Sequence, residues 1–206
     1  MAAMGYICTR RRDLSSEANG RPKTRRREAR RGEGERVSGG GQRQCGECGL
    51  CCKVVAYPEL DKPRGVWCRH YLPHKGCGIH ETRPDVCRRF FCLWITNAEF
   101  GEEWQPNKAG FFMWEDRVQN GRRLILEVDG DRPNHWMRQP YLNALRQIAD
   151  RRSGQTVEVI VRTRGKVKML FPEGLVDLGD HKELPVRSGY RAEGGKLVPY
   201  AEYVEA

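Results

Sequence analysis

The sequence lacks the features of an exported or membrane-spanning chain. Residues 1–19 contain no apolar segment of the ~7–15 residues typical of a signal peptide and no small-residue cleavage site. No stretch approaches the ~18 consecutive apolar residues that a transmembrane helix needs. We therefore expect a cytoplasmic protein with no membrane partner, in a compartment where thiols stay reduced.

Familiar catalytic signatures are also missing. No Ser-His-Asp set, phosphate-binding loop or pair of carboxylates stands out, so the sequence assigns no catalytic residue. Whether the protein is an enzyme stays open at this point. Cysteine is absent from residues 108–180, and Cys8 has no other cysteine nearby. We exclude Cys8 from any site.

What the sequence does have is a dense cluster of cysteines. Eight of its nine cysteines lie within 48 residues, so one residue in six there is cysteine, well above the ~8–10% that marks a cysteine scaffold. They are Cys45, Cys48, Cys51, Cys52, Cys68, Cys77, Cys87 and Cys92. Thiols at this density form disulfides or bind metal, and a reducing compartment favours metal. Export by an unrecognised route would favour disulfides instead.

The first cysteine run has the spacing C-x2-C-x2-C and is followed directly by another cysteine. Two intervening residues let paired thiolates converge on one ion, as in zinc sites, and the same interval begins a ferredoxin-type run. Zinc and an iron–sulfur cluster both remain open. Cys51 and Cys52 are adjacent and point roughly 100° apart on a helix, so we expect two neighbouring sites or one multinuclear cluster. The alternative is that one of the pair is only a small buried apolar residue.

The segment Thr82-Arg83-Pro84-Asp85 predicts a helix start with Thr82 as N-cap, which places Cys87 one turn into the helix. Arg83, Arg88 and Arg89 either offset thiolate charge or lie on the surface.

Three histidines lie among the cysteines, namely His70, His74 and His80. They are close enough in sequence to serve as spare ligands or to support the ligands by hydrogen bonds. Because eight thiolates already complete two four-coordinate sites, we do not include these histidines in the predicted ligand set.

The order and spacing of these segments resemble those of the YkgJ-like cysteine-cluster family, whose members are described as zinc- or iron-chelating proteins. The resemblance covers residues 45–94: the CxxCxxCC run, a lone Cys68, Gly76-Cys77-x-Ile79-His80, and Arg83-Pro84-x2-Cys87-Arg88-x-Phe90-x-Cys92. It implies eight metal-ligand cysteines and says little about a reaction. It also implies that His80 is structural, because the family has an aromatic residue or histidine there. Some flagellin lysine methylases are similar across this region, but the sequence has no nucleotide loop and no C-x3-C-x2-C radical motif.

The formal charge of +10 is concentrated at the N-terminus. Residues 1–44 hold twelve basic and five acidic side chains, whereas residues 45–206 hold 25 and 22. This basic leader has almost no apolar periodicity, so we expect it to be disordered. Its arginine blocks can bind nucleic acid weakly through phosphate contacts. An alternative is that translation starts at Val37 and residues 1–36 are not made.

Residues 106–180 predict a small α+β unit. Two strands flank Asn120-Gly121, a helix spans residues 140–152, and strands over 157–161 and 167–171 complete the order ββαββ. The aromatic residues Phe111, Phe112, Trp114 and Trp136 resemble a base-stacking platform, but at strand periodicity we expect them in the core. Glu127, Asp129 and Asp131 fit either a cation site or ordinary turn chemistry. Residues 181–206 are predicted to form a flexible tail.

The sequence thus predicts an α+β protein: a Cys-rich module (residues 45–105) of loops and short helices, joined to the α+β unit. The leading hypothesis is a protein whose eight cysteines hold zinc, iron or an iron–sulfur cluster. One alternative is an iron–sulfur redox enzyme or a methylase-like accessory protein. A second is a zinc-stapled nucleic-acid module, which the near-balanced charge of residues 45–206 disfavours. No protein partner is indicated.

Overall fold

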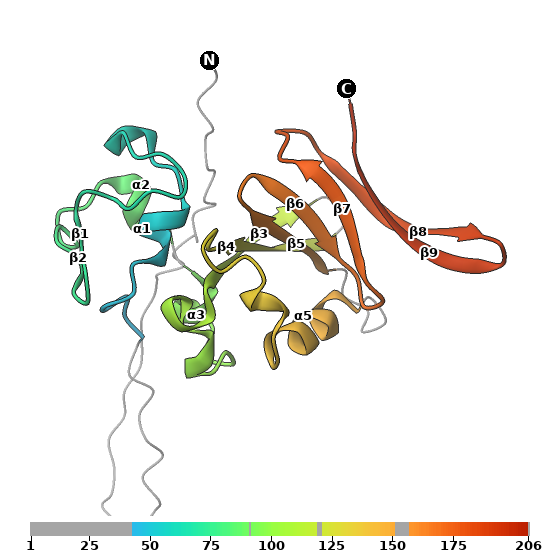
Figure 1. The fold of residues 1–206 in the computed structure, drawn as a ribbon, viewed down its shortest axis with the longest axis horizontal. Coiled ribbons are helices and arrows are strands. Elements are labelled where there is room, and N and C mark those ends of the chain that lie inside the picture. The colour runs from blue at the N-terminus through green and yellow to red at the C-terminus, as the bar shows by residue number, and fades with distance from the viewer. Residues whose placement is uncertain (1–42, 91, 119–120, 151–156, 206) are drawn as a thin grey trace, which may run out of the picture. The chain divides into compact units, whose positions relative to one another are not determined.

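The computed structural model describes residues 43–90, 92–118, 121–150 and 157–205 (Figure 1). Most of the basic leader, with Cys8 and the arginine blocks, lies outside the described residues, as does Asn120. At the start of the described chain, Arg43 donates hydrogen bonds from Nη1 to the carbonyls of Trp94 and Asn97 at 2.9 and 3.2 Å. Its guanidinium also lies over the Trp94 ring, 5.0 Å from the centroid.

The Cys-rich module consists of short elements joined by turns. In chain order they are α1 (Leu50–Val54), η1 (Pro58–Leu60), β1 (Tyr71–Leu72), β2 (Gly76–Cys77), α2 (Asp85–Arg88), α3 (Leu93–Thr96), η2 (Glu102–Trp104) and α4 (Pro106–Ala109). None of these helices exceeds five residues, so propensity alone does not stabilise them and tertiary contacts must do so. The described helices include none long and apolar enough to span a membrane.

The α+β unit is built on a five-stranded sheet. Its elements are β3 (Phe111–Val118), β4 (Gly121–Val128), η3 (His135–Met137), α5 (Tyr141–Ala149), β5 (Val157–Thr163), β6 (Lys166–Leu170) and β7 (Leu175–Asp180). The strand order is β3-β4-β5-β6-β7, in which β4 and β5 are parallel and the other described neighbours are antiparallel. The predicted order ββαββ is observed, with β7 added after β6.

The chain combines helices with sheets, so the predicted α+β class is confirmed. Apolar residues alternate along the central strands and divide between the two faces of the sheet. On β4, Leu124 and Leu126 face the larger core with α5, whereas Ile125 faces the opposite side. Leu50, Val54 and Trp94 of the Cys-rich module belong to that same larger core. The module and the sheet therefore share one core.

The aromatic residues of β3 lie in that core. Phe111 and Phe112 are 1% and 2% exposed, Trp136 is 3% exposed, and Trp114 is half-buried. The core interpretation is confirmed for the three buried rings, which have no face available for stacking on a base.

The expectation of a flexible tail over residues 181–206 is wrong for most of that segment. Residues 186–203 form a hairpin of β8 (Val186–Glu193) and β9 (Lys196–Tyr203). Its residues Val186, Tyr190 and Ala201 pack on the sheet face that contains Ile125. Ser188 Oγ donates to Glu158 at 2.7 Å, which adds a polar contact between the hairpin and β5. Burial of one hairpin face explains why this segment is ordered.

The predicted Thr82 cap is also wrong. Helix α2 begins at Asp85 with Pro84 in the N-cap position, and no side chain caps it. The Thr82 amide instead donates to the Ile79 carbonyl at 3.0 Å in a turn. Proline disfavours helical backbone at the preceding residue, so the helix starts only after Pro84. Cys87 does lie in α2, as predicted.

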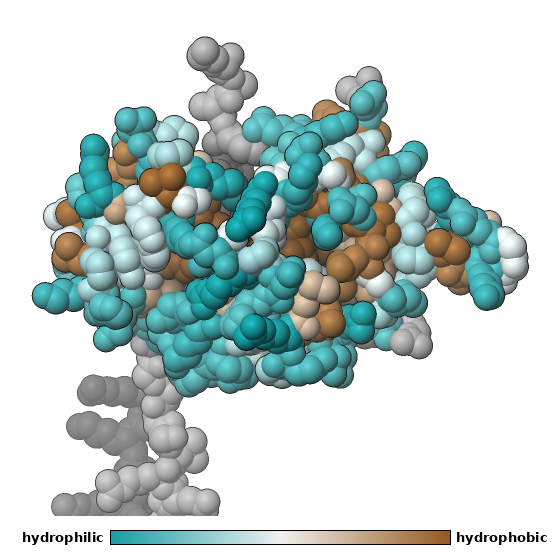
Figure 2. Space-filling view, viewed as in Figure 1, coloured by the Kyte–Doolittle hydropathy of each residue, from teal (hydrophilic) through white to brown (hydrophobic). Residues whose placement is uncertain are grey.

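The surface is mostly hydrophilic, with apolar side chains exposed in a few places (Figure 2). Among the described residues of the Cys-rich module, the large apolar side chains Val66, Trp67 and Leu72 are 52%, 45% and 46% exposed. Trp67 stacks on Tyr71 with ring centroids 4.0 Å apart.

Candidate metal centre

The fold places the eight predicted cysteines on or beside four short elements. Cys45 and Cys48 form the turn before α1, Cys51 and Cys52 lie on α1, Cys77 ends β2, Cys87 lies in α2, and Cys92 is the N-cap residue of α3. Cys68 lies in the loop before β1. All eight are free thiols; Cys68 and Cys92 are buried and the others are partly exposed. The described residues therefore contain no disulfide that would compete with metal binding.

Helix α1 carries the vicinal pair. Cys51 packs with Cys48 and Cys92 against the larger core, whereas Cys52 does not belong to that cluster. On the other side, the Cys52 carbonyl accepts a hydrogen bond from the Cys68 amide at 2.8 Å. The two thiols are hydrogen-bonded to each other, so the pair connects the cysteines on its two sides.

The core-side thiols are Cys45, Cys48, Cys51 and Cys92, here called the inner group. A turn closed by the Cys48 amide and the Cys45 carbonyl, 2.8 Å apart, brings the first two together. The pKa of Cys92 is raised to about 11, mainly by burial and then by the nearby Cys48 and Cys45. The pKa of Cys51 is raised by its hydrogen bond with Cys52, by burial, and by Cys52, Cys48 and Cys45. Negative charge on any of these sulfurs thus opposes charge on the others.

The remaining thiols, Cys52, Cys68, Cys77 and Cys87, are here called the outer group. The pKa of Cys87 is raised to about 11, mainly by burial and then by the nearby Cys52, Cys68 and Cys77. Burial is also the main cause of the raised pKa of Cys77, which Cys52 and Cys68 raise further. The hydrogen bond from Cys51 lowers the pKa of Cys52 to about 7 despite burial.

The two groups adjoin. A Cβ atom on Gly76 would lie 2.2 Å from the Gly46 carbonyl oxygen, so the β2 strand that carries Cys77 touches the turn between Cys45 and Cys48. Only glycine permits this approach, and its φ of 80° also favours glycine. Burial raises the pKa of Cys45 most, and the neighbouring Cys48, Cys52 and Cys77 raise it further.

The sulfur atoms are gathered but do not converge on one point. Within the described ranges, no three His, Cys, Asp or Glu side chains are arranged to hold a metal ion. Metal binding therefore requires thiol side chains to rotate about their Cα–Cβ bonds, which the partial exposure of six of them permits. The donor set itself, eight thiols without disulfides, fits zinc or iron–sulfur chemistry.

Positive charge lies close to the outer group. The Lys62 side chain is 5% exposed, and its Nζ donates to the carbonyls of Lys53 at 2.7 Å, Pro63 at 3.0 Å and Val55. Burial lowers the pKa of Lys62, and the nearby Cys52, Cys68 and Cys51 partly offset this. No sequence pattern identifies Lys62, because its partners are backbone carbonyls, two of them at the end of α1.

The three predicted arginines differ in position. Arg83 lowers the pKa of four cysteines, although other causes are larger in each case: Cys45, Cys52, Cys77 and Cys87. Arg88 instead donates to the carbonyls of Arg83 and Glu81 at 2.7 and 2.9 Å. Arg89 lies 3.5 Å from Asp85 on the surface. Only Arg83 is thus positioned to offset thiolate charge.

The histidines of the module lie at or near the surface. His74 and His80 are exposed, and His70 is half-buried with its Nε2 3.4 Å from the Arg69 side chain.

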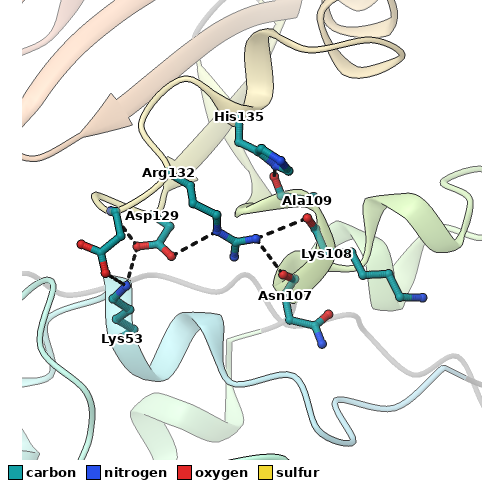
Figure 3. A network of polar contacts seen from close by, with 8 residues as sticks. Lys53, Asn107, Lys108, Ala109, Asp129, Arg132 and His135 are labelled. Carbon is teal, nitrogen blue, oxygen red and sulfur yellow. Dashed lines mark hydrogen bonds and ion pairs between the residues drawn. The ribbon is translucent and has the colours of Figure 1, made fainter.

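A polar network fixes α1 to the loop after β4 (Figure 3). Lys53, the residue after Cys52, donates from Nζ to Asp129 at 2.7 Å and to Asp131 at 2.5 Å. Asp129 also pairs with Arg132 at 3.5 Å, and Arg132 reaches the Asn107 carbonyl at 3.0 Å. The carboxylates that the sequence offered as a cation site thus bind basic side chains of the protein. The network holds the vicinal cysteines at a fixed position relative to the sheet.

Comparison with known proteins adds no relative. A scan against protein-family models finds no match, and searches of curated proteins and of solved structures find none either. The resemblance to the YkgJ-like cysteine-cluster family therefore stays a prediction that rests on the spacing of residues 45–94.

Proposed function

We propose that this protein binds metal through its eight clustered cysteines, as two adjacent four-thiolate sites. The inner site comprises Cys45, Cys48, Cys51 and Cys92, and the outer site comprises Cys52, Cys68, Cys77 and Cys87. The observation that supports the proposal is the position of the vicinal pair on α1, where the hydrogen-bonded Cys51 and Cys52 thiols lie at the junction of the two groups. Cys51 faces Cys48 and Cys92 in the core, while Cys52 lies beside Cys68.

The donor chemistry suits zinc or iron. Four thiolates complete a closed tetrahedral zinc site, and the same ligand number holds an iron–sulfur cluster. When bound, zinc would supply folding free energy, and an iron–sulfur cluster would add redox capacity. Two closed sites leave no open coordination position, which favours a structural role over catalysis at the metal. We place the protein in the cytoplasm, where thiols remain reduced and available to metal.

The residues around the thiols support this role. Four thiolates around one divalent ion carry a net charge of about −2, which requires nearby positive charge. Lys62 and Arg83 supply it on the outer side. On the inner side, packing against the larger core excludes water from Cys48, Cys51 and Cys92.

Metal stoichiometry of single variants tests the proposal. Because the two sites have separate ligands, Cys48→Ser should remove one ion and leave the other, and Cys87→Ser should do the same for the opposite site. The double variant Cys48→Ser/Cys87→Ser should lose both. Cys8→Ser is the matched control and should retain the wild-type content. Equal metal content in Cys48→Ser, Cys87→Ser and wild type would contradict metal binding by these cysteines, and loss of all metal from either single variant would indicate one shared cluster.

A further inference from the structure

A cavity of about 440 Å³ lies at one end of the five-stranded sheet. Its floor is formed where β4 and β5 end, by residues 127–131 and 162–166. Lys53 and Val54 of α1, the loop residues Arg64 and Gly65, and His181 complete the lining. None of the eight clustered cysteines lines this cavity, so the cavity is separate from the proposed metal sites.

The position of the cavity is one that open sheets use for ligands. Strands β4 and β5 are parallel, from Arg122 paired with Val157 to Glu127 paired with Arg162. They are joined through α5, which makes them a β-α-β unit. Ligands of such units bind beyond the carboxyl ends of the parallel strands, where loops and strand ends leave a crevice. The cavity lies beyond the carboxyl ends of this pair.

The lining is rich in arginine. Arg64 Nη1 and Arg162 Nη1 both contact the buried carboxylate of Glu127, at 2.7 and 3.3 Å. Two positive charges therefore share one negative charge, and one positive charge is left over. The other lining carboxylates, Asp129 and Asp131, already bind Lys53. These three acids together balance Arg64, Arg162 and Lys53, so the positive excess of the lining comes from Arg164 and from Lys166, which pairs with the exposed Asp180 at 2.8 Å.

Arg162 and Arg164, which both line the cavity, have donors that no ion pair or hydrogen bond among the described residues uses. The Nε–H of Arg162 is buried and has no hydrogen-bond partner in the described chain. Arg164 makes no ion pair with any described residue, and its side chain lies over Gly130, where a Cβ atom would approach Arg164 Cγ to 3.2 Å. Gly130 thus allows the guanidinium to lie across the cavity. Partial burial, followed by the charges of Arg162 and Arg64, lowers the pKa of the nearby His181, in keeping with positive potential there.

We propose that this cavity binds a small ligand through an oxyanion, either a phosphate or a carboxylate group, held by Arg64, Arg162 and Arg164. Arginine suits this role because its planar guanidinium donates two parallel hydrogen bonds to such groups. Glu127 acts as an internal anion that holds Arg64 and Arg162 in place when no ligand is bound. The ligand adds to Glu127 and interacts mainly with Arg164, which makes no ion pair with any described residue. The proposal does not depend on the metal sites.

Calorimetric titration of the full chain with inorganic phosphate, and separately with succinate, tests the site. Wild type should bind at least one of the two anions, and the tighter one identifies the group. Arg164→Gln should weaken binding roughly tenfold or more, because a charge-assisted hydrogen bond is lost. Arg122→Gln is the matched control. It removes an arginine at the opposite end of β4, paired with Glu115 at 3.2 Å, and should bind like wild type.

A variant that is expected to bind the anion more tightly separates a loss of recognition from a folding defect. Glu127→Gln keeps the side-chain shape but frees the charges of Arg64 and Arg162, so it should bind the anion several-fold more tightly. A misfolded protein does not gain affinity. The site is refuted if wild type binds neither anion at millimolar concentration. It is also refuted if Arg164→Gln and Arg122→Gln bind alike, because binding then comes from positive charge elsewhere in the chain.

Discussion

The Nζ atom of Lys53 lies 2.7 Å from Oδ1 of Asp129, and both side chains are buried. Lys53 directly follows Cys51 and Cys52, so this ion pair links the vicinal cysteines to the end of β4. Removing one partner of a buried pair leaves the other charge uncompensated, at a cost of about 3–5 kcal/mol. Variants of the Lys53–Asp129 pair therefore test how strongly this pair attaches the Cys-rich module to the sheet.

Lys53→Met should lower the free energy of unfolding by about 3 kcal/mol, because Asp129 then retains only the Arg132 contact at 3.5 Å and the hydrogen bond from the Asp131 amide. Urea denaturation followed by tryptophan fluorescence measures this. Lys108→Met is the matched control, since its contact with Glu102 is long, at 3.7 Å, and exposed. Equal midpoints for the two variants would show that the Lys53 pair does not stabilise the fold.

The same pair predicts a pH dependence. Burial alone would raise the pKa of Asp129, but hydrogen bonds from Lys53 and the Asp131 amide hold it below its ordinary value. A carboxylate with a depressed folded-state pKa stabilises the protein above its unfolded pKa of about 3.9, and this stabilisation is lost as pH falls through the folded pKa. The difference in unfolding free energy between wild type and Asp129→Asn should therefore be constant near neutral pH and shrink below about pH 4. A difference that grows on acidification would contradict this assignment.

Lys62 gives a separate prediction. Lys62→Met leaves the carbonyls of Lys53, Val55 and Pro63 without their buried donor. Each unsatisfied buried acceptor costs about 1–3 kcal/mol, so the variant should be destabilised by at least that much, and the α1 amides should exchange hydrogen faster. Lys75→Met, at an exposed position, is the control. Unchanged exchange in α1 would mean that solvent replaces Lys62 at these carbonyls.

The basic leader predicts salt-sensitive binding to nucleic acid. Twelve of the 37 basic residues lie in residues 1–44, so any affinity for DNA or RNA should fall steeply as salt concentration rises and disappear when this segment is deleted. Electrophoretic mobility shifts at two salt concentrations measure both effects. Salt-insensitive binding that survives the deletion would instead point to a recognition surface within residues 45–206.

Local periodicity predicted much of the fold. The helix expected over 140–152 is α5, and the alternation of Val157, Val159 and Val161 marks β5. The hairpin of residues 186–203 was missed because Gly189 and Pro199 interrupt its pattern, and because its stability depends on a sheet face formed by distant residues.

The candidate site was predictable in its residue types but not in its arrangement. The spacing of the cysteines predicts all eight as candidate ligands, whereas the hydrogen bond between the Cys51 and Cys52 thiols could not be seen in sequence. The pairing of Cys92 with the first run, and of Cys52 with Cys68, depends on the packing of α1. The roles of Lys53 and Lys62 could not be seen in sequence either, since Lys53 binds a carboxylate 76 residues away.

Metal analysis after strictly anaerobic purification tests the central claim most directly. Elemental analysis, acid-labile sulfide and a visible spectrum are measured on the same sample of the full chain. Two four-thiolate sites predict about two zinc ions per chain with a colourless protein, or iron with sulfide and visible charge-transfer absorbance. In either case the eight thiols should resist alkylation until a chelator or acid removes the metal. A metal-free protein whose eight thiols all react at once, and which takes up neither zinc nor iron on reconstitution, would contradict the account.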